Sequence, residues 1–150
     1  MPNKEELHQL QMTFRTIMNR MRKVWSDQTE LGLNPTQFSV LEKLHEQGSL
    51  KVTEVAKLLC LTAGAVTGIT DKLIELGYVE RRRDEVDRRT VYLEMTQLGS
   101  DAYLKTLEHR ADLFKRFFDQ VPDESISQFI KVCHKVNDNL DRLTTECAES

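Results

Sequence analysis

Apolar residues at both ends of the chain recur at alternating steps of three and four positions. This heptad spacing predicts three long helices, each with one narrow apolar seam, and it is the spacing found in helices that associate along their length. The three sets are, in chain order, Leu7, Leu10, Phe14, Ile17, Met21 and Val24; Leu104, Leu107, Ala111, Phe114, Phe118 and Val121; and Ile126, Phe129, Cys133, Val136, Leu140, Leu143 and Cys147.

The seams allow two interpretations. The three helices pack against one another within a single chain, or they also pair with a second copy. Sustained heptad seams favour the second interpretation, so we expect a homodimer. Thr96 is expected to cap the second of these helices, which then runs to Val121, and Pro122 is expected to start the third.

Shorter amphipathic segments lie between the terminal helices. Asn34 and Pro35 are a cap-like residue and a first-turn proline, so they predict a helix that ends near Gly48. Its apolar positions are Phe38, Leu41 and Leu44.

Residues 52–73 carry two further helical patterns. Thr53 is expected to cap the first helix, Cys60 and Leu61 to form the turn, and Thr62 to cap the second helix. The small Ala56 lies where two steeply crossing helices need a small side chain. The expected core positions around it are Val55, Leu59, Leu61, Val66 and Ile69. The segment therefore predicts a helix-turn-helix.

An arginine-rich hairpin follows at once. Gly77 lies where a helix end favours a left-handed residue, and two strand-like runs, 78–79 and 91–93, flank the segment expected to form a loop. Arginines at a hairpin tip reach a phosphate backbone or a narrow minor groove. This segment carries, among its charged residues, Arg81, Arg82, Arg83, Asp84, Glu85, Asp87, Arg88 and Arg89. The predicted fold is thus mainly α with a small β-hairpin wing: a winged helix-turn-helix flanked by long N- and C-terminal dimerisation helices.

The second helix of the helix-turn-helix is expected to face a major groove with its outer side. If Val66, Ile69 and Leu73 face inward, the outward residues are Ala63, Gly64, Thr67, Gly68 and Asp71. That face has neither Arg nor Lys, so base contacts would depend on Thr67 and on the close approach that the glycines permit. Thr62 and Lys72 are candidate phosphate contacts. Direct base recognition is expected to be limited, which gives the wing and DNA shape more weight.

Composition narrows the function without deciding it. The net charge is -3, and residues 50–96 hold eight basic and eight acidic residues, so bulk charge does not indicate a polyanion-binding protein. No apolar run follows the first Met, so we expect no signal peptide, no membrane span and a cytoplasmic location. P-loop, nucleophile-elbow, dinucleotide and HExxH motifs are absent, so we expect no enzyme activity and no cofactor.

The chain resembles the MarR family of bacterial winged-helix transcriptional regulators. The resemblance rests on Leu73-x-x-x-Gly77-Tyr78-Val79 with Arg81, and on Asp87-Arg88-Arg89-x-x-x-Leu93-x-Met95-Thr96-x-x-Gly99. It implies a homodimer on double-stranded DNA with a pseudo-palindromic operator, most often as a repressor. It further implies that Arg89 contacts the minor groove, that Asp87 orients the wing through an arginine, and that Arg88 serves the wing or the backbone. Many members carry a basic residue where this chain has Gly68, which weakens the expectation of guanine recognition.

The resemblance also implies a division of labour along the chain. Residues 1–33 and 97–150 are expected to form the dimerisation region, and residues 34–96 the DNA-binding lobe. In many relatives a small phenolic or lipophilic ligand binds between these parts and releases DNA. The candidate pocket residues here are Met12, Arg15, Met18, Trp25 and Phe38. Core packing is the alternative for the apolar members, and solvation is the alternative for Arg15.

Other forms of regulation are less supported. Cys60 directly precedes a helix N-terminus, which leaves a redox role open, but a packed turn residue is the favoured role. The four His residues form no i, i+4 pair, so no metal site is expected. The alternative function is a helical protein–protein adaptor that uses the winged fold without DNA, an interpretation to which the electrically neutral lobe adds some weight.

Overall fold

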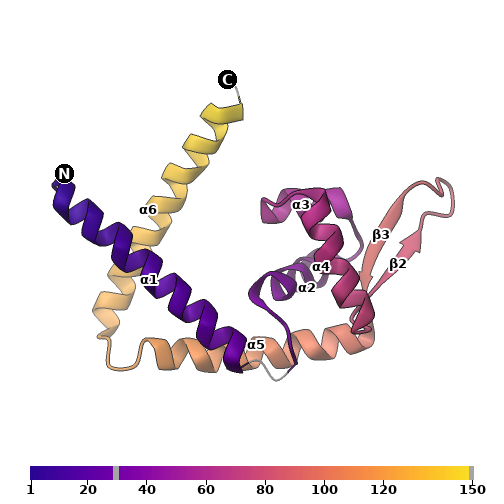
Figure 1. Cartoon of the computed structure of the whole chain (residues 1–150), viewed down its shortest axis with the longest axis horizontal. Helices are drawn as coiled ribbons and strands as arrows, with labels where there is room; N and C mark the ends of the chain where they lie inside the picture. Colours follow the sequence, from indigo (N-terminus) through magenta and orange to yellow (C-terminus); the bar gives the residue numbers. More distant parts are fainter. Residues whose placement is uncertain (29–30, 149–150) are drawn as a thin grey trace. The chain divides into compact units, whose positions relative to one another are not determined.

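A computed structural model describes residues 1–28 and 31–148, with side chains described up to Thr144. These residues form helices α1 (Lys4–Gln28), α2 (Pro35–Gln47), α3 (Val52–Leu59), α4 (Ala63–Glu75), α5 (Gln97–Phe117) and α6 (Asp123–Ala148). They also form strands β1 (Leu50–Lys51), β2 (Val79–Arg83) and β3 (Val91–Met95). The predicted fold class, mainly helical with a small hairpin wing, is confirmed (Figure 1).

The chain divides into two compact units, Met1–Leu113 and a second that begins at Phe114. The first unit contains the helix-turn-helix, the wing and most of α5. The second contains the end of α5 and all of α6. These units are defined by contacts within the chain and not by function. The separation of a dimerisation region from a DNA-binding lobe stays a prediction.

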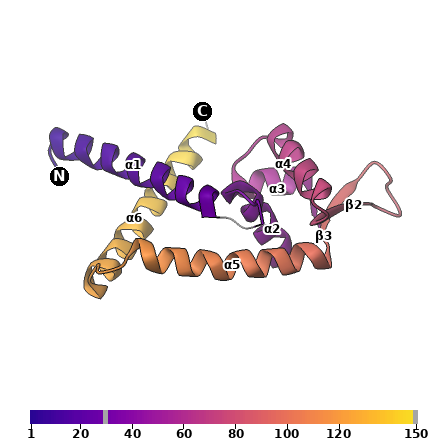
Figure 2. The same cartoon turned by 60° about the horizontal axis from the view of Figure 1, so that its bottom comes forward.

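The core of the first unit lies among α2, α3, α4 and the base of the sheet (Figures 1 and 2). Its fully buried apolar side chains are Phe38, Val40, Leu41, Val55, Val66, Leu73 and Leu93. Val55 and Val66 were predicted core positions, and the three others, Leu59, Leu61 and Ile69, pack against this core while partly buried. Helical periodicity therefore placed the inner faces of α3 and α4 correctly.

Local hydrogen bonds define the start of α2 as predicted. The Asn34 side chain accepts from the Gln37 backbone N–H at 2.8 Å, and the Gln37 side chain accepts from the Asn34 N–H at 2.9 Å. This reciprocal capping satisfies two N–H groups that a helix leaves unpaired at its start. The helix ends at Gly48, which adopts φ +77°.

The helix-turn-helix bends by 109° between α3 and α4, within the range of DNA-binding motifs. Thr62 caps α4 as predicted, accepting from the Ala65 N–H at 3.2 Å. The predicted cap at Thr53 is wrong, because α3 already begins at Val52 and Lys51 is its N-cap residue. The Glu54 side chain accepts a hydrogen bond from the Lys51 N–H at 2.7 Å. Cys60 is in the turn, but it is exposed rather than packed and adopts a left-handed φ of +54°.

The sheet has three strands in the order β1-β3-β2, all antiparallel. The two-residue strand β1 was not predicted, and its Leu50 pairs with Leu93. Strand β2 extends further than predicted, because its pairing with β3 continues to Arg83 opposite Val91. Arg81, Arg82 and Arg83 therefore lie on a strand. The loop spans residues 84–90 and carries Arg88 and Arg89.

A compact clamp joins the wing to α5. The Thr96 hydroxyl donates to the Gly77 carbonyl at 2.6 Å and accepts the Gly99 N–H at 3.0 Å, which confirms the predicted cap. The Thr96 N–H donates to the Tyr78 carbonyl at 3.0 Å. A Cβ added at Gly99 would lie 2.0 Å from the Tyr78 carbonyl oxygen, so this position requires glycine.

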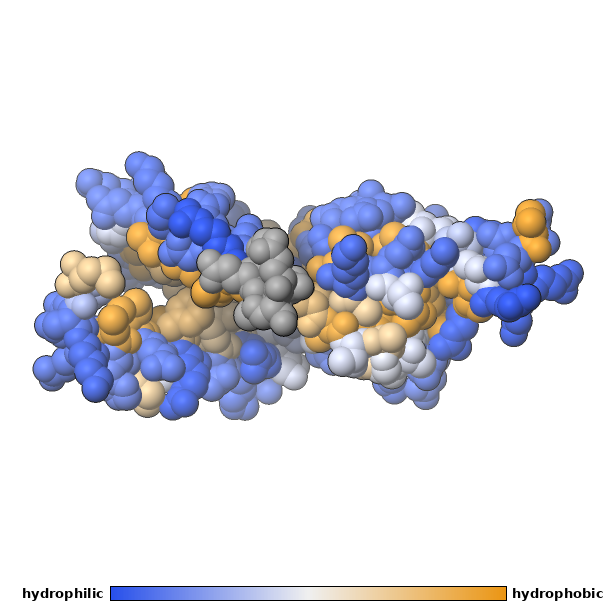
Figure 3. Space-filling model, turned by 90° about the horizontal axis from the view of Figure 1, so that it is seen from above, coloured by the Kyte–Doolittle hydropathy of each residue, from blue (hydrophilic) through white to orange (hydrophobic). Residues whose placement is uncertain are grey.

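The terminal helices leave most of their apolar seams open. In α1, Leu10 is 62% exposed, and in α6, Leu143 is 56% exposed. Apolar patches lie between hydrophilic side chains on the face seen in Figure 3. Helix α5 ends at Phe117 instead of the predicted Val121, because the chain turns through Gln120 at φ +61°. The last predicted seam residue, Cys147, lies outside the residues whose side chains are described.

No single helix in the described parts of the chain combines the length and apolar character of a membrane span. The bent pair of α3 and α4 meets the length and composition criteria only when the two are taken together.

Candidate nucleic-acid interface

Helix α4 presents a small, uncharged surface over its first two turns. Ala63, Gly64, Thr67 and Gly68 are exposed, while Val66, Thr70 and Leu73 are buried. The Thr67 hydroxyl donates to the Ala63 carbonyl at 2.9 Å. Its proton is therefore used inside the helix, which leaves the oxygen as an acceptor and the methyl group for apolar contact.

The two glycines of this surface are not required by packing against any residue that the structure describes. A Cβ added at Gly64 or Gly68 would meet nothing within 4 Å. Glycine inside a helix costs about 0.5–1 kcal/mol relative to alanine. The folded chain carries this cost without an internal reason, which fits a helix face that must approach a partner closely.

The charged residues of α4 are engaged with neighbours. Lys72 pairs with Glu75 at 3.2 Å, so this predicted phosphate contact already has an anionic partner in the free protein. Asp71 forms an ion pair with Arg81 of β2. Thr62, the other predicted phosphate contact, is exposed and uses its side chain to cap α4.

Arg82 is held at the base of the wing. Its guanidinium donates to Glu94 of β3 at 2.6 Å and lies 5.3 Å from the centre of the Tyr92 ring. Glu94 also accepts a 2.6 Å hydrogen bond from the Ser49 hydroxyl. The Ser49 hydroxyl and the Arg82 guanidinium hold the pKa of the Glu94 carboxyl below its usual value, because both stabilise the carboxylate.

The wing loop is ordered by its own carboxylates. Asp84 accepts the N–H groups of Val86 at 2.8 Å and Asp87 at 3.3 Å, and these bonds lower the pKa of the Asp84 carboxyl. Asp87 accepts the backbone N–H of Arg89 at 3.1 Å and the Thr90 hydroxyl at 3.4 Å. Asp87 thus binds the main-chain N–H of Arg89 and not the Arg89 guanidinium.

The arginines of the wing fall into two groups. Arg81 and Arg82 have carboxylate partners, and Arg83 donates to the Arg88 carbonyl at 3.2 Å. The guanidinium groups of Arg88 and Arg89 are exposed and make no hydrogen bond or ion pair with any residue that the structure describes. Contacts of the wing with α4, with β3 and within its own loop decide this distinction, which the sequence alone did not reveal.

The five predicted pocket residues are not brought together in the single chain. Trp25 and Phe38 are buried, whereas Met12, Arg15 and Met18 lie on the exposed part of α1. Two residues that sequence reasoning missed complete the aromatic cluster: the Arg110 guanidinium lies 5.2 Å from the Trp25 ring and 4.9 Å from the Phe38 ring, and Tyr103 stacks on Phe38 at 5.3 Å. The sequence signal that could have revealed this cluster is Tyr103, an aromatic residue on α5.

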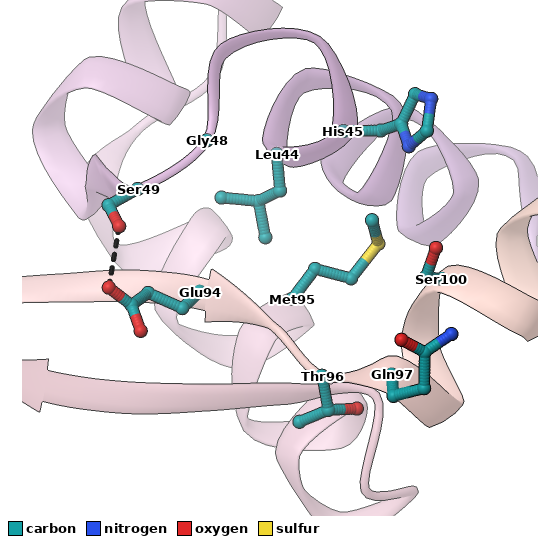
Figure 4. A pocket seen from close by; sticks show the side chains of 9 residues that line it. All are labelled: Leu44, His45, Gly48, Ser49, Glu94, Met95, Thr96, Gln97 and Ser100. Atoms are coloured by element: carbon teal, nitrogen blue, oxygen red, sulfur yellow. Dashed lines mark hydrogen bonds between the residues drawn. The ribbon is translucent and has the colours of Figure 1, made fainter.

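A cavity of about 340 Å³ lies elsewhere in the first unit, between the end of α2, strand β3 and the start of α5 (Figure 4). None of the five predicted pocket residues lines it. The lining residues are Leu44, His45, Gly48, Ser49, Glu94, Met95, Thr96, Gln97 and Ser100. Within the described ranges, no group of three His, Cys, Asp or Glu residues is placed to hold a metal ion.

A helix-turn-helix with an exposed second helix and an arginine-tipped wing defines a winged-helix DNA-binding lobe. The family model named MarR family matches residues 33–91. The chain is 33% identical over 128 residues to the uncharacterized HTH-type transcriptional regulator YkoM of Bacillus subtilis (strain 168), covering 81% of this chain and 82% of that protein. It is 29% identical over 127 residues to the transcriptional repressor MdtR of the same organism, covering 85% of this chain and 80% of that protein.

Solved structures share the fold. A MarR mutant from E. coli, solved in complex with operator DNA, has a TM-score of 0.77 at 20% identity and covers 91% of this chain and 99% of that chain. The protein belongs to the MarR family, and it is a DNA-binding transcriptional regulator. These findings favour the regulator over the adaptor alternative.

Proposed function

We propose that the protein is a homodimeric repressor that binds a pseudo-palindromic operator in the cytoplasm. In each protomer, α4 enters a major groove and the tip of the wing reaches the adjacent minor groove. The observation that carries this proposal is a pair of guanidinium groups, Arg88 and Arg89, that have no partner in the described parts of the chain. Both lie on a loop ordered by Asp84 and Asp87. Free cations on an ordered loop bind phosphates or a narrow groove at low entropic cost.

The proposed dimer is supported by the open seams of the terminal helices. Phe14 of α1, Leu104 of α5 and Leu140 of α6 are between 49% and 53% exposed. Regular rows of exposed large apolar side chains mark interaction surfaces. A two-fold dimer would present two α4 helices about 34 Å apart, which corresponds to half-sites one DNA turn apart.

The proposed repressor role is supported by the similarity to MdtR, a relative described as a transcriptional repressor. Release by a small phenolic or lipophilic ligand remains part of the proposal. The aromatic cluster of Trp25, Phe38 and Tyr103 beside the Arg110 guanidinium has the chemistry for an aromatic ligand with an acidic group. Met12, Arg15 and Met18 would contribute only if a second copy brought them to such a site.

The DNA-binding proposal is tested by Arg89→Ala. Binding to a duplex that the wild-type protein selects from random sequence should weaken at least tenfold, and the slope of log affinity against log salt should fall by about one unit. The measurement is fluorescence anisotropy across a salt series.

The matched control is Lys131→Ala on α6, which removes one exposed positive charge outside the lobe. It should leave both affinity and slope unchanged. Equal losses in the two variants would show a bulk-charge effect and remove Arg89 from the site. The dimer is tested separately by light scattering, where a monomeric mass at micromolar concentration would contradict it.

A further inference from the structure

We propose that Asp71 and Arg81 act together as a positioning pair that sets the wing relative to α4 on DNA. The inference rests on the proposed DNA-binding function. It assigns to Asp71 a role that its charge alone would not indicate, because Asp71 lies on the exposed side of the helix expected to enter the groove.

The pair spans the connection between α4 and the wing. Asp71 lies one turn after Thr67 on α4, and Arg81 lies on β2. The chain between them passes through Gly77, which adopts φ +79° at the end of the helix. An ion pair across this connection restricts how far the wing can rotate about it.

The register of the sheet explains why Arg81, and not Arg82, faces the helix. Arg81 is opposite Leu93, whose side chain is fully buried in the core, and β2 itself packs against α4. Alternate residues of a strand point to opposite faces of the sheet. Arg82 therefore lies on the other face, where its partner Glu94 belongs to the sheet itself.

The Asp71–Arg81 ion pair joins α4 to the wing, whereas Lys72–Glu75 stays within α4 and Arg82–Glu94 stays within the sheet. Its side chains are 57% and 44% exposed. Exposed ion pairs contribute little to folding stability. The pair is therefore better explained by the geometry of the interface than by the stability of the fold.

Electrostatics supplies a test in which positioning and charge act in opposite directions. An acidic side chain near phosphates repels them, so its neutralisation alone should strengthen DNA binding. If Asp71 positions the wing through Arg81, its neutralisation should weaken binding. Asp71→Asn keeps the size of the side chain while removing its charge.

Glu75 provides the matched control. It lies one turn further along α4 and pairs with Lys72, so Glu75→Gln also removes one negative charge and one ion pair from the same helix. It leaves the link to the wing intact. We expect Asp71→Asn to weaken binding to the selected duplex at least fivefold, and Glu75→Gln to leave binding unchanged or up to threefold tighter.

The experiment measures fluorescence anisotropy of the full chain with the duplex selected by the wild-type protein and with an unrelated duplex of equal length. Arg81→Gln and the Asp71→Asn/Arg81→Gln double variant complete a cycle. If the residues act through each other, the double variant binds no more weakly than the weaker single variant, and the loss is larger on the selected duplex than on the unrelated one.

Binding by Asp71→Asn that equals or exceeds that of the wild type would overturn the proposal. So would single losses that multiply in the double variant. Failure of the proposed function is a separate outcome, because the wild-type protein would then retain no duplex at all.

Discussion

Helix α4 and the wing present opposite surfaces to solvent. The outer face of α4 is small and uncharged over Ala63–Gly68, and a Cβ added at either of its two glycines would meet no described atom within 4 Å. The wing carries five arginines. Three of them have internal partners, whereas the guanidinium groups of Arg88 and Arg89 at the tip have no partner among the described residues. On the proposed DNA interface, the helix would contribute close fit and the wing would contribute charge. The internal ion pairs would then decide which of the wing charges are available to DNA.

The largest expected effect concerns the anchor of the wing. Gly99→Ala places a Cβ 2.0 Å from the Tyr78 carbonyl oxygen, so the start of α5 must separate from the start of β2. We expect a loss of about 3 kcal/mol or more in the free energy of unfolding, measured by urea denaturation. Thr96→Ser keeps the hydroxyl that joins Gly77 to Gly99 and serves as the mild control. A near-normal Gly99→Ala protein would show that the clamp is not rigid.

The second prediction separates fit from stability on α4. Gly64→Ala and Gly68→Ala should each stabilise the fold by about 0.5–1 kcal/mol, since the new methyl meets nothing and the helix gains a better helix former. Each should also weaken binding to the selected duplex, by about tenfold, if the backbone of α4 approaches the groove closely. Thermal unfolding and anisotropy give the two values. Tighter or unchanged DNA binding by both variants would contradict close approach.

A third prediction concerns the turn that leads into α4. Cys60 adopts φ +54°, a conformation that costs a residue with a Cβ about 1 kcal/mol. Cys60→Gly should raise the free energy of unfolding by about that amount and leave the wing unchanged. Cys60→Ala keeps the Cβ and therefore should show no comparable gain in the same denaturation experiment. Equal stability of the glycine and alanine variants would show that the backbone at Cys60 is not strained.

The smallest expected effect is the pH dependence of the wing base. The pKa of Glu94 is lowered in the folded chain, so its carboxylate stabilises the fold above the ordinary glutamate pKa of about 4.3. That contribution disappears as the pH falls through the lowered folded pKa. At pH 7 the free energy of unfolding of the wild type should exceed that of Glu94→Gln by less than about 1 kcal/mol, because the ion pair of Glu94 with Arg82 is partly exposed.

Urea denaturation at several pH values between 3 and 7 measures this difference. The two proteins should converge in stability at the acidic end of the series. A constant difference at every pH would assign the effect of the substitution to packing instead of charge.

Features determined by neighbours in the sequence were predictable. The caps at Asn34, Thr62 and Thr96 follow from short-range hydrogen bonds, and the inner face of α4 follows from helical periodicity. Together with the wing motif, they were enough to predict the fold class and the family.

Features determined by pairing between distant segments were not predictable. Strand β1 has two residues, too few for a periodic signal, and Arg81–Arg83 became part of β2 only through register with β3. The same holds for Arg110, whose contact with Trp25 depends on how α5 lies against the core. The roles of the proposed DNA-contacting residues stay predictions.

The internal ion pairs of the wing bear on how quickly the protein finds its target. If the proposed interface is right, a lobe with balanced charge, and with two wing arginines that have no partner among the described residues, would displace few counterions from random sequence. Its residence time on any arbitrary stretch of DNA would then be short. Most of a search through the genome would then proceed by frequent dissociation and rebinding in three dimensions, with little sliding along the duplex.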